Sequence, residues 1–185
     1  MNEHKLIIGG AGFIGSNLVK EFLNLNFNLT VVDNFSRGRL KYLEKHKENN
    51  NLTILSFDVS DSEQCEKAFK EANENCQIDE VWHLAANSDI PAGVANPDID
   101  FKDTFLTTFQ ILKSMKKFNV NIINFASSSA IYGDFGETII HESIGPLKPI
   151  SNYGAMKLAS EAQITAAVED FLERANIFRF PNVVG

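Results

Sequence analysis

The stretch Leu6–Ser16, LIIGGAGFIGS, decides the fold of this chain, because an apolar run ends in three spaced glycines and an amphipathic run follows at once. In a strand–turn–helix, Gly9 allows the tight turn, Gly12 lets the backbone approach a pyrophosphate, and Gly15 lets the helix pack close to the strand. The free N–H groups and the positive dipole end of that helix favour a doubly negative ligand. A small-residue turn without a ligand is the alternative that these residues leave open.

The composition is that of one soluble domain. Its 185 residues are enough to bury a core, and 44% hydrophobic with 22% charged residues argues against disorder. The net charge is −7 and no Lys/Arg cluster stands alone, so neither nucleic acid nor a membrane is expected as a partner. Cys65 and Cys76 lack metal-ligand spacing and are expected as buried or half-buried thiols in a reducing compartment. No signal peptide or membrane span is recognisable, which predicts a cytoplasmic protein.

Strand-like and helix-like patterns alternate along the whole chain. After the first strand, the pattern predicts a helix over 12–24, a strand over 28–32, a short helix over 40–47, a strand over 52–57, and a helix capped by Ser60 or Asp61. Strands over 78–84, 121–127 and 177–180 then alternate with helices over 100–118 and 151–174. Such alternation predicts an α/β fold, a doubly wound Rossmann sheet of parallel strands with helices on both faces, as one domain over 1–185.

Polar residues follow the predicted strands at their carboxyl ends, where such sheets bind ligands. Asp33, 18 positions past Gly15, can accept hydrogen bonds from both hydroxyls of an adenosine ribose and would repel a 2′-phosphate, which favours NAD over NADP. Arg37 and Arg39 keep NADP open, and an aspartate that opens a turn is the structural alternative. Asp58 is expected at the adenine edge or, alternatively, as a helix cap.

A candidate chemical group is the pair Tyr153 and Lys157, which lie four apart on one face of a predicted helix. The serines at 127–129 end a neighbouring strand and supply the polar pocket that a reactive pair needs; the alternative is a solvated helix pair. Tyrosine titrates near pH ~10, and an ammonium about 4 Å away at an effective dielectric near 20 lowers that pKa by roughly three units. We predict that Tyr153 serves as acid and base, with Lys157 also holding the nicotinamide ribose.

Taken together, these residues resemble the extended short-chain dehydrogenase/reductase family, in its NAD-dependent nucleotide-sugar epimerase/dehydratase branch. The resemblance covers essentially all of the chain. It rests on Gly9-x-x-Gly12-Phe13-Ile14-Gly15, Val32-Asp33-Asn34-Phe35-Ser36, Asp58-Val59, His83-Leu84-Ala85-Ala86, Ser127-Ser128-Ser129-Ala130-Ile131-Tyr132-Gly133, Tyr153-x-x-x-Lys157 and Arg179-Phe180-Pro181-Asn182-Val183-Val184-Gly185.

The resemblance implies a role for each site residue. Phe13 and Ile14 lie against the pyrophosphate, and the nicotinamide is bordered by Pro181. The adenosine ribose is surrounded by Asp33, Asn34, Ser36, Arg37 and Gly38, adenine by Asp58 and Val59, and the nicotinamide side by Leu84, Ala85, Ala86 and Ser88. The catalytic serine stands four before the tyrosine of the Tyr-Gly pair, which gives Ser128, 25 before Tyr153, beside Tyr153 and Lys157.

Epimerisation is the reaction that the resemblance favours. Many dehydratases and decarboxylases of this branch read Thr-(Asp/Ser)-Glu before Val-Tyr-Gly, whereas Ser129 and Ala130 offer no carboxylate here. We therefore expect a hydride to pass from the sugar C4 to NAD, the 4-keto sugar to turn over, and the hydride to return to its other face. A nucleotide-sugar dehydratase, lyase or reductase on the same scaffold and a non-catalytic NAD-binding module are the alternatives.

Further expectations concern the rest of the chain. Family members run on into a carboxyl-terminal substrate domain, so the chain is expected to be truncated before it, inactive on its own, and still able to bind NAD. The full-length protein is expected to be a homodimer through the helices that carry Phe105 and Leu172. Thr104 stands where the family often has Asn. His83 is expected to be structural, and His4 to be solvated.

Overall fold

Six parallel strands form the centre of the protein in the computed structural model, which describes residues 2–74 and 76–184. Gly185, the last residue of the expected 179–185 motif, lies outside the described residues. The strands are β1 (His4–Ile8), β2 (Asn28–Asp33), β3 (Leu52–Ser56), β4 (Glu80–His83), β5 (Ile122–Ser128) and β6 (Arg174–Phe180), in the order β3-β2-β1-β4-β5-β6. Every neighbouring pair is parallel. The strand order reverses between β1 and β4, the place where doubly wound sheets bind their ligands.

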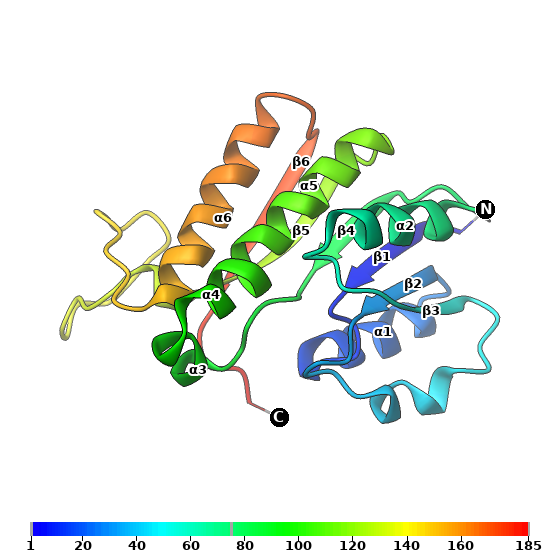
Figure 1. Cartoon of the computed structure of the whole chain (residues 1–185), viewed down its shortest axis with the longest axis horizontal. Coiled ribbons are helices and arrows are strands. Elements are labelled where there is room, and N and C mark those ends of the chain that lie inside the picture. Colours follow the sequence, from blue (N-terminus) through cyan, green and yellow to red (C-terminus); the bar gives the residue numbers. More distant parts are fainter. Residues whose placement is uncertain (1, 75, 185) are drawn as a thin grey trace.

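Helices cover both faces of the sheet, as the alternating pattern predicts (Figure 1). The helices are α1 (Phe13–Asn24), α2 (Ser62–Asn73), α3 (Ile90–Ala95), α4 (Pro97–Asp100), α5 (Thr107–Lys117) and α6 (Asn152–Val168). A π-helical turn η3 (Phe101–Leu106) joins α4 to α5, and 3₁₀ turns form η1 (Leu40–Tyr42), η2 (Glu44–His46) and η4 (Ser129–Ile131). Figure 1 shows α2, α5 and α6 along one face and α1 on the other.

Alternate residues of β1 enter two separate cores, and every residue of this strand is buried. Leu6 and Ile8 belong to a cluster with side chains of α2, α5 and α6, including Phe69, whereas Ile7 packs with Val19 of α1. A strand that is buried on both faces has no polar-out alternation, which is why its sequence is a continuous apolar run.

Two predicted helices have different ends in the structure. Residues 40–47 form the two short turns η1 and η2 rather than one helix. The helix expected over 151–174 ends at Val168, and β6 begins at Arg174, three residues before its predicted start. The amides of Phe171 and Leu172 both donate to the Ala167 carbonyl, so the chain reverses there. Leu172 is 4% exposed, because it packs into the core from the turn.

One of the two predicted caps of α2 is confirmed, whereas His4 differs from what the sequence suggested. Asp61 caps α2, because its carboxylate accepts a hydrogen bond from the Gln64 backbone N–H at 2.9 Å. Asp58 is therefore not the cap of this helix. His4 is buried rather than solvated: its ring lies 2.9 Å from the Cys76 carbonyl oxygen and 2.9 Å from Thr30 Oγ1. Burial lowers the pKa of His4, although hydrogen bonds to backbone carbonyls act against this.

Neither cysteine forms a disulfide, and Cys65 is buried while Cys76 is half-buried. Burial raises the pKa of the Cys65 thiol to about 11. Within residues 2–74 and 76–184, no three His, Cys, Asp or Glu side chains are grouped so as to hold a metal ion. In the same part of the chain, no helix has the length and apolar character needed to cross a membrane.

Candidate cofactor and catalytic site

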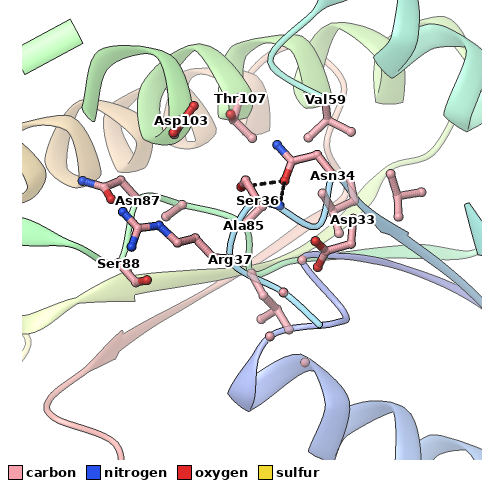
Figure 2. Close-up of a pocket in the computed structure, with 18 of the residues that line it drawn as sticks. Asp33, Asn34, Ser36, Arg37, Val59, Ala85, Asn87, Ser88, Asp103 and Thr107 are labelled. Atoms are coloured by element: carbon pink, nitrogen blue, oxygen red, sulfur yellow. Dashed lines mark hydrogen bonds between the residues drawn. The ribbon is translucent and has the colours of Figure 1, made fainter. Parts of the chain in front are cut away.

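A crevice of about 350 Å³ lies at the carboxyl ends of β1, β2 and β4, beside α5 (Figure 2). The glycine turn and the residues after the first four strands come together there. The predicted cofactor residues that line it are Gly9, Gly12, Phe13, Ile14, Gly15, Asp33, Asn34, Ser36, Arg37, Gly38, Asp58, Val59, Leu84, Ala85, Ala86 and Ser88.

The glycine turn brings backbone segments so close together that side chains at Gly9 and Gly15 would not fit. Gly9 has φ +84°, and a Cβ there would lie 2.7 Å from the Ala85 amide nitrogen. A Cβ on Gly15 would lie 2.6 Å from the Cα of Gly10. Gly12 is the N-cap of α1 and has no side chain to bond the first turn, which also carries no acidic residue. The first N–H groups of α1 can therefore bind an anion in the crevice, and a dinucleotide's pyrophosphate fits this arrangement.

Asp33 lies at the end of β2 and is 8% exposed. One carboxylate oxygen accepts from the Ala11 amide at 2.9 Å and the other from the Phe35 amide at 2.9 Å. A Cβ on Gly38 would lie 2.7 Å from Asp33 Oδ1, so only glycine lets the loop pass this close. Each carboxylate oxygen can accept a second hydrogen bond, which leaves capacity for two ribose hydroxyls.

Two ion pairs connect the first half of the sheet to the second at the crevice. One joins Arg37 to Asp89, and the other joins Lys102 to Asp58. Arg37 Nη2 lies 3.1 Å from Asp89 Oδ2, and Figure 2 shows Arg37 extended toward Asn87 and Ser88. The Ala92 amide and then Arg37 lower the pKa of Asp89. Burial pushes the pKa of Asp58 upward, but hydrogen bonds from Ser60 and Lys102 outweigh burial and lower it.

Some lining residues were not predicted from the sequence. Asp103 and Thr107 lie four apart and reach the crevice from η3 and α5 (Figure 2), and burial raises the pKa of Asp103. Their spacing is a helical face, but nothing local shows that this face meets the glycine turn. The other unpredicted lining residues are Ile8, Val32, Phe57 and Ala126, whereas Asn87 falls within the 84–88 stretch expected on the nicotinamide side.

The predicted catalytic residues meet where β5 and α6 come together. Ser128 ends β5, and its Oγ accepts from the Ala130 amide at 3.1 Å. The Ser128 hydroxyl lies close enough to the phenol of Tyr153 to act on the pKa of that phenol. Lys157 is 2% exposed, and its Nζ donates to the Ala126 carbonyl at 2.6 Å. Ala126 lines the crevice, so the ammonium lies directly behind the crevice wall.

The expected effect of Lys157 on Tyr153 is wrong in this structure. Burial raises the pKa of Tyr153, the Ser128 hydrogen bond acts against that rise, and the charge of Asp100 adds to it. The Lys157 Nζ lies 5.9 Å from the centre of the Tyr153 ring and 4.6 Å from that of Phe125, and it bonds to a carbonyl rather than to the phenol. Burial lowers the pKa of Lys157 to about 7, with the charge of Glu161 opposing it.

Three predicted cofactor residues do not line the crevice. Tyr153 and Lys157 are not among its lining residues, and Pro181 is exposed on the segment after β6. Of the serines that flank Ser128, Ser129 is exposed, whereas Ser127 is buried and its hydroxyl donates to Glu161.

His83 and Thr104 belong to a buried polar chain. The Thr108 hydroxyl donates its only proton to the Thr104 carbonyl oxygen at 3.0 Å. The His83 Nε2 lies 3.0 Å from the same hydroxyl oxygen, so Nε2 must be the donor in that hydrogen bond. The His83 Nδ1 is then an unprotonated acceptor, buried without a partner among the described residues. Burial lowers the pKa of His83 well below its usual value, which fits the predicted structural role. Thr104 Oγ1 accepts a hydrogen bond from the backbone N–H of Asn87 at 3.2 Å.

Comparison with known proteins places this geometry in a family. The profile of the NAD dependent epimerase/dehydratase family matches residues 5–185. UDP-glucose 4-epimerase of Corynebacterium glutamicum is 30% identical over 180 residues, which is 97% of this chain and 51% of that protein. The chain therefore spans about half the length of such curated relatives.

Solved structures of two relatives share the fold. UDP-glucose 4-epimerase of Thermus thermophilus, in complex with NAD, superposes with a TM-score of 0.84 at 29% identity, covering 95% of this chain and 54% of that one. UDP-N-acetylglucosamine 4-epimerase of Methanobrevibacter ruminantium, in complex with UDP-N-acetylmuramic acid, gives a TM-score of 0.87 at 30% identity, covering 100% and 56%. Because the family profile spans almost all residues from β1 to the segment after β6, this chain belongs to the NAD dependent epimerase/dehydratase family.

Proposed function

We propose that residues 1–185 form the NAD-binding part of a nucleotide-sugar 4-epimerase that acts on a UDP-sugar. The observation that carries this proposal is the meeting of Ser128, Tyr153 and Lys157 behind the wall of a crevice that the glycine turn and Asp33 equip for a dinucleotide. A module that only binds NAD has no use for a half-buried phenol set beside a serine hydroxyl. The relatives named above are 4-epimerases of UDP-sugars, which supports the substrate class.

The cofactor proposed is NAD rather than NADP. Asp33 places a carboxylate where a 2′-phosphate would lie, and Arg37, which could neutralise that phosphate, is paired with Asp89. The first turn of α1 would hold the pyrophosphate, with Phe13 and Ile14 against it. Leu84 and Ala85 would flank the nicotinamide.

In the proposed mechanism the protein moves one proton at the sugar C4 hydroxyl. NAD, when bound, supplies the hydride acceptor and returns the hydride. Tyr153 takes the hydroxyl proton as the 4-keto sugar forms, and gives a proton back when the sugar has turned. Ser128 holds the same oxygen by hydrogen bonding. A positively charged nicotinamide ring beside Tyr153 would lower the pKa of its phenol and so oppose the rise that burial causes.

Epimerisation is favoured over dehydration by the turn after β5. Elimination of a sugar hydroxyl needs an additional acid or base, and Ser129 and Ala130 hold the positions where the resemblance implies a carboxylate in dehydratases. Ser129 is exposed, and Ala130 contributes its backbone amide to Ser128.

We also propose that the longer protein works in the cytoplasm as a homodimer. Phe101 and Phe109 are 50% and 45% exposed on η3 and α5, beside Phe105, and offer apolar surface for a second subunit. Leu172, which was expected to contribute, is buried in the core and offers no surface to a second subunit. Light scattering on the longer protein tests this, and a monomer would refute it.

The experiment that tests the proposed function has two arms. In the first, titration calorimetry measures NAD and NADP binding to this chain, with NAD expected to bind at least about tenfold more tightly. In the second, this chain replaces the matching segment of the Corynebacterium glutamicum epimerase, and the C4 epimer of a UDP-hexose is measured. Tyr153→Phe is expected to abolish turnover and to retain NAD. Turnover by the phenylalanine variant, or release of a dehydrated sugar, would contradict the proposal.

A further inference from the structure

Glu161 lies one turn beyond Lys157 on α6 and is buried with it. The two residues are 5% and 2% exposed. Side chains four apart share one face of a helix, so the carboxylate and the ammonium point to the same side. A buried carboxylate requires hydrogen-bond donors, and Glu161 has them: the Ser127 hydroxyl donates to one oxygen, and Arg179 donates from Nη2 at 2.8 Å and from Nε at 3.2 Å.

Arg179 connects this carboxylate to the segment that leads into α6. Its Nη1 donates to the Glu142 carbonyl at 2.7 Å and to the Tyr132 hydroxyl at 3.3 Å. The guanidinium also lies 5.3 Å from the centre of the Tyr132 ring. One side chain of β6 thus holds both Glu161 and the 133–151 segment, whose last residue, Ser151, caps α6 just before Tyr153.

The groups around Lys157 leave Glu161 as its electrostatic support. On β4, His83 is neutral because burial lowers its pKa well below the usual value. Tyr153 is uncharged because burial raises its pKa, and Asp100 of α4 acts on that phenol. Burial lowers the pKa of Lys157 to about 7, and Glu161 is the group that raises it. Arg179 of β6 carries an opposing positive charge, but it bonds directly to Glu161.

We propose that Glu161 is a positioning residue that favours the ammonium form of Lys157 behind the crevice wall, and that Arg179, by sharing the carboxylate, limits how strongly it does so. The charge on Lys157 is a property of the chain itself. Only the consequence for Tyr153 and a bound nicotinamide ribose rests on the proposed function.

The test is a pH titration of Lys157 by NMR in the 185-residue chain, with ¹³C-labelled lysine and the signal assigned by its loss in Lys157→Arg. In the wild type, the midpoint of the Lys157 titration is expected at a pH of about 7, the pKa of this lysine in the folded chain. Glu161→Gln is expected to lower it by about one pH unit, because a negative neighbour is removed at constant shape. Arg179→Gln is expected to raise it, because the carboxylate is no longer neutralised.

The opposite signs separate electrostatics from simple damage. If Glu161 only braced the fold, its loss would admit water and move the midpoint upward toward the free lysine value of about 10.4. A rise or no change in Glu161→Gln therefore overturns the inference. Glu169→Gln, at the exposed end of the same helix, is the matched control and is expected to leave the midpoint unchanged.

Two additions keep the outcome clear. If Arg179→Gln does not fold by circular dichroism, Ser127→Ala takes its place: it removes one donor from the carboxylate and is expected to raise the midpoint, and a fall would count against the inference. NAD is titrated into the same samples. Failure of the wild type to bind NAD refutes the proposed function and leaves the lysine result standing, whereas unchanged titration in Glu161→Gln refutes the inference alone.

Discussion

The Arg37 guanidinium and the Asp89 carboxylate lie 3.1 Å apart, with Arg37 in the loop after β2 and Asp89 at the N-cap of α3. On the neighbouring side, Lys102 and Asp58 lie 3.0 Å apart. Both ion pairs join the first half of the sheet to the second across the crevice, so each can restrict the passage of a dinucleotide. Exposed ion pairs are weak and screened by salt, which gives the first pair a measurable signature.

Asp89→Asn is expected to speed release of NADH by about threefold at low salt, with the difference lost near ~0.5 M NaCl, as for a screened ion pair. Asparagine still caps α3, where Asp89 Oδ1 accepts from the Ala92 amide at 3.0 Å, so helix stability is retained. Stopped-flow fluorescence of NADH measures the rate. Arg37→Gln should match it, and the double variant should add nothing further. Additive effects would show that the two side chains act separately.

The glycine turn makes a prediction in which binding and stability separate. A Cβ on Gly12 meets only the Gly9 carbonyl oxygen, at 3.4 Å, whereas a Cβ on Gly15 meets the Gly10 Cα at 2.6 Å. Gly12→Ala should therefore unfold within about 1 kcal/mol of wild type in urea, yet bind NAD at least about tenfold more weakly, because the methyl group points into the pyrophosphate path. Gly15→Ala should lose about 1–3 kcal/mol of stability, because backbone atoms must move. Equal destabilisation by both variants would contradict this division.

The sequence predicted the crevice well because its residues follow directly from local structure. Gly9 and Leu84 directly follow β1 and β4, Asp33 is the last residue of β2, and parallel strands bring their carboxyl ends to one edge. The residues that were missed reach the crevice from a helix. Asp103 and Thr107 lie on η3 and α5, and which face of that helix meets the glycine turn is decided by core packing, a property that no short motif carries.

The electrostatics of the catalytic pair were predicted wrongly for a related reason. From the spacing of Tyr153 and Lys157, the ammonium was expected to act on the phenol, but Lys157 is buried and bonds to the Ala126 carbonyl, and the half-buried Tyr153 is itself partly desolvated. Desolvation depends on everything packed around a group, so it cannot be judged from two residues in a sequence. The end of α6 is a similar case, since Leu172 continues the apolar pattern from a turn.

The buried Lys157 gives the protein a pH-dependent stability with a definite sign. Its pKa is about 7 in the folded chain, whereas an ordinary lysine, as in the unfolded chain, has a pKa of 10.5. Between these two pH values the unfolded chain therefore binds more protons than the folded chain. The free energy of unfolding then rises with pH, by up to about 1.4 kcal/mol per pH unit, and below pH 7 this contribution is flat. Lys157→Met should remove this slope between pH 7 and 9, below the range in which the Cys65 thiol titrates at about 11. Urea unfolding at a series of pH values measures it, and parallel profiles would refute the buried-lysine origin.

Thr104, which stands where the family often has Asn, is predicted to hold the crevice loop in place. Its Oγ1 is the acceptor for the Asn87 amide at 3.2 Å, and Thr104 is 1% exposed. Thr104→Val keeps the shape and the β-branch but leaves a buried N–H without a partner, which should cost about 1–3 kcal/mol in urea unfolding. Thr165→Val is the matched control: that hydroxyl bonds to a carbonyl of its own helix, α6, from an exposed position, so the change should stay within about 0.5 kcal/mol. Equal losses in the two variants would assign the effect to helix propensity instead of the Asn87 amide.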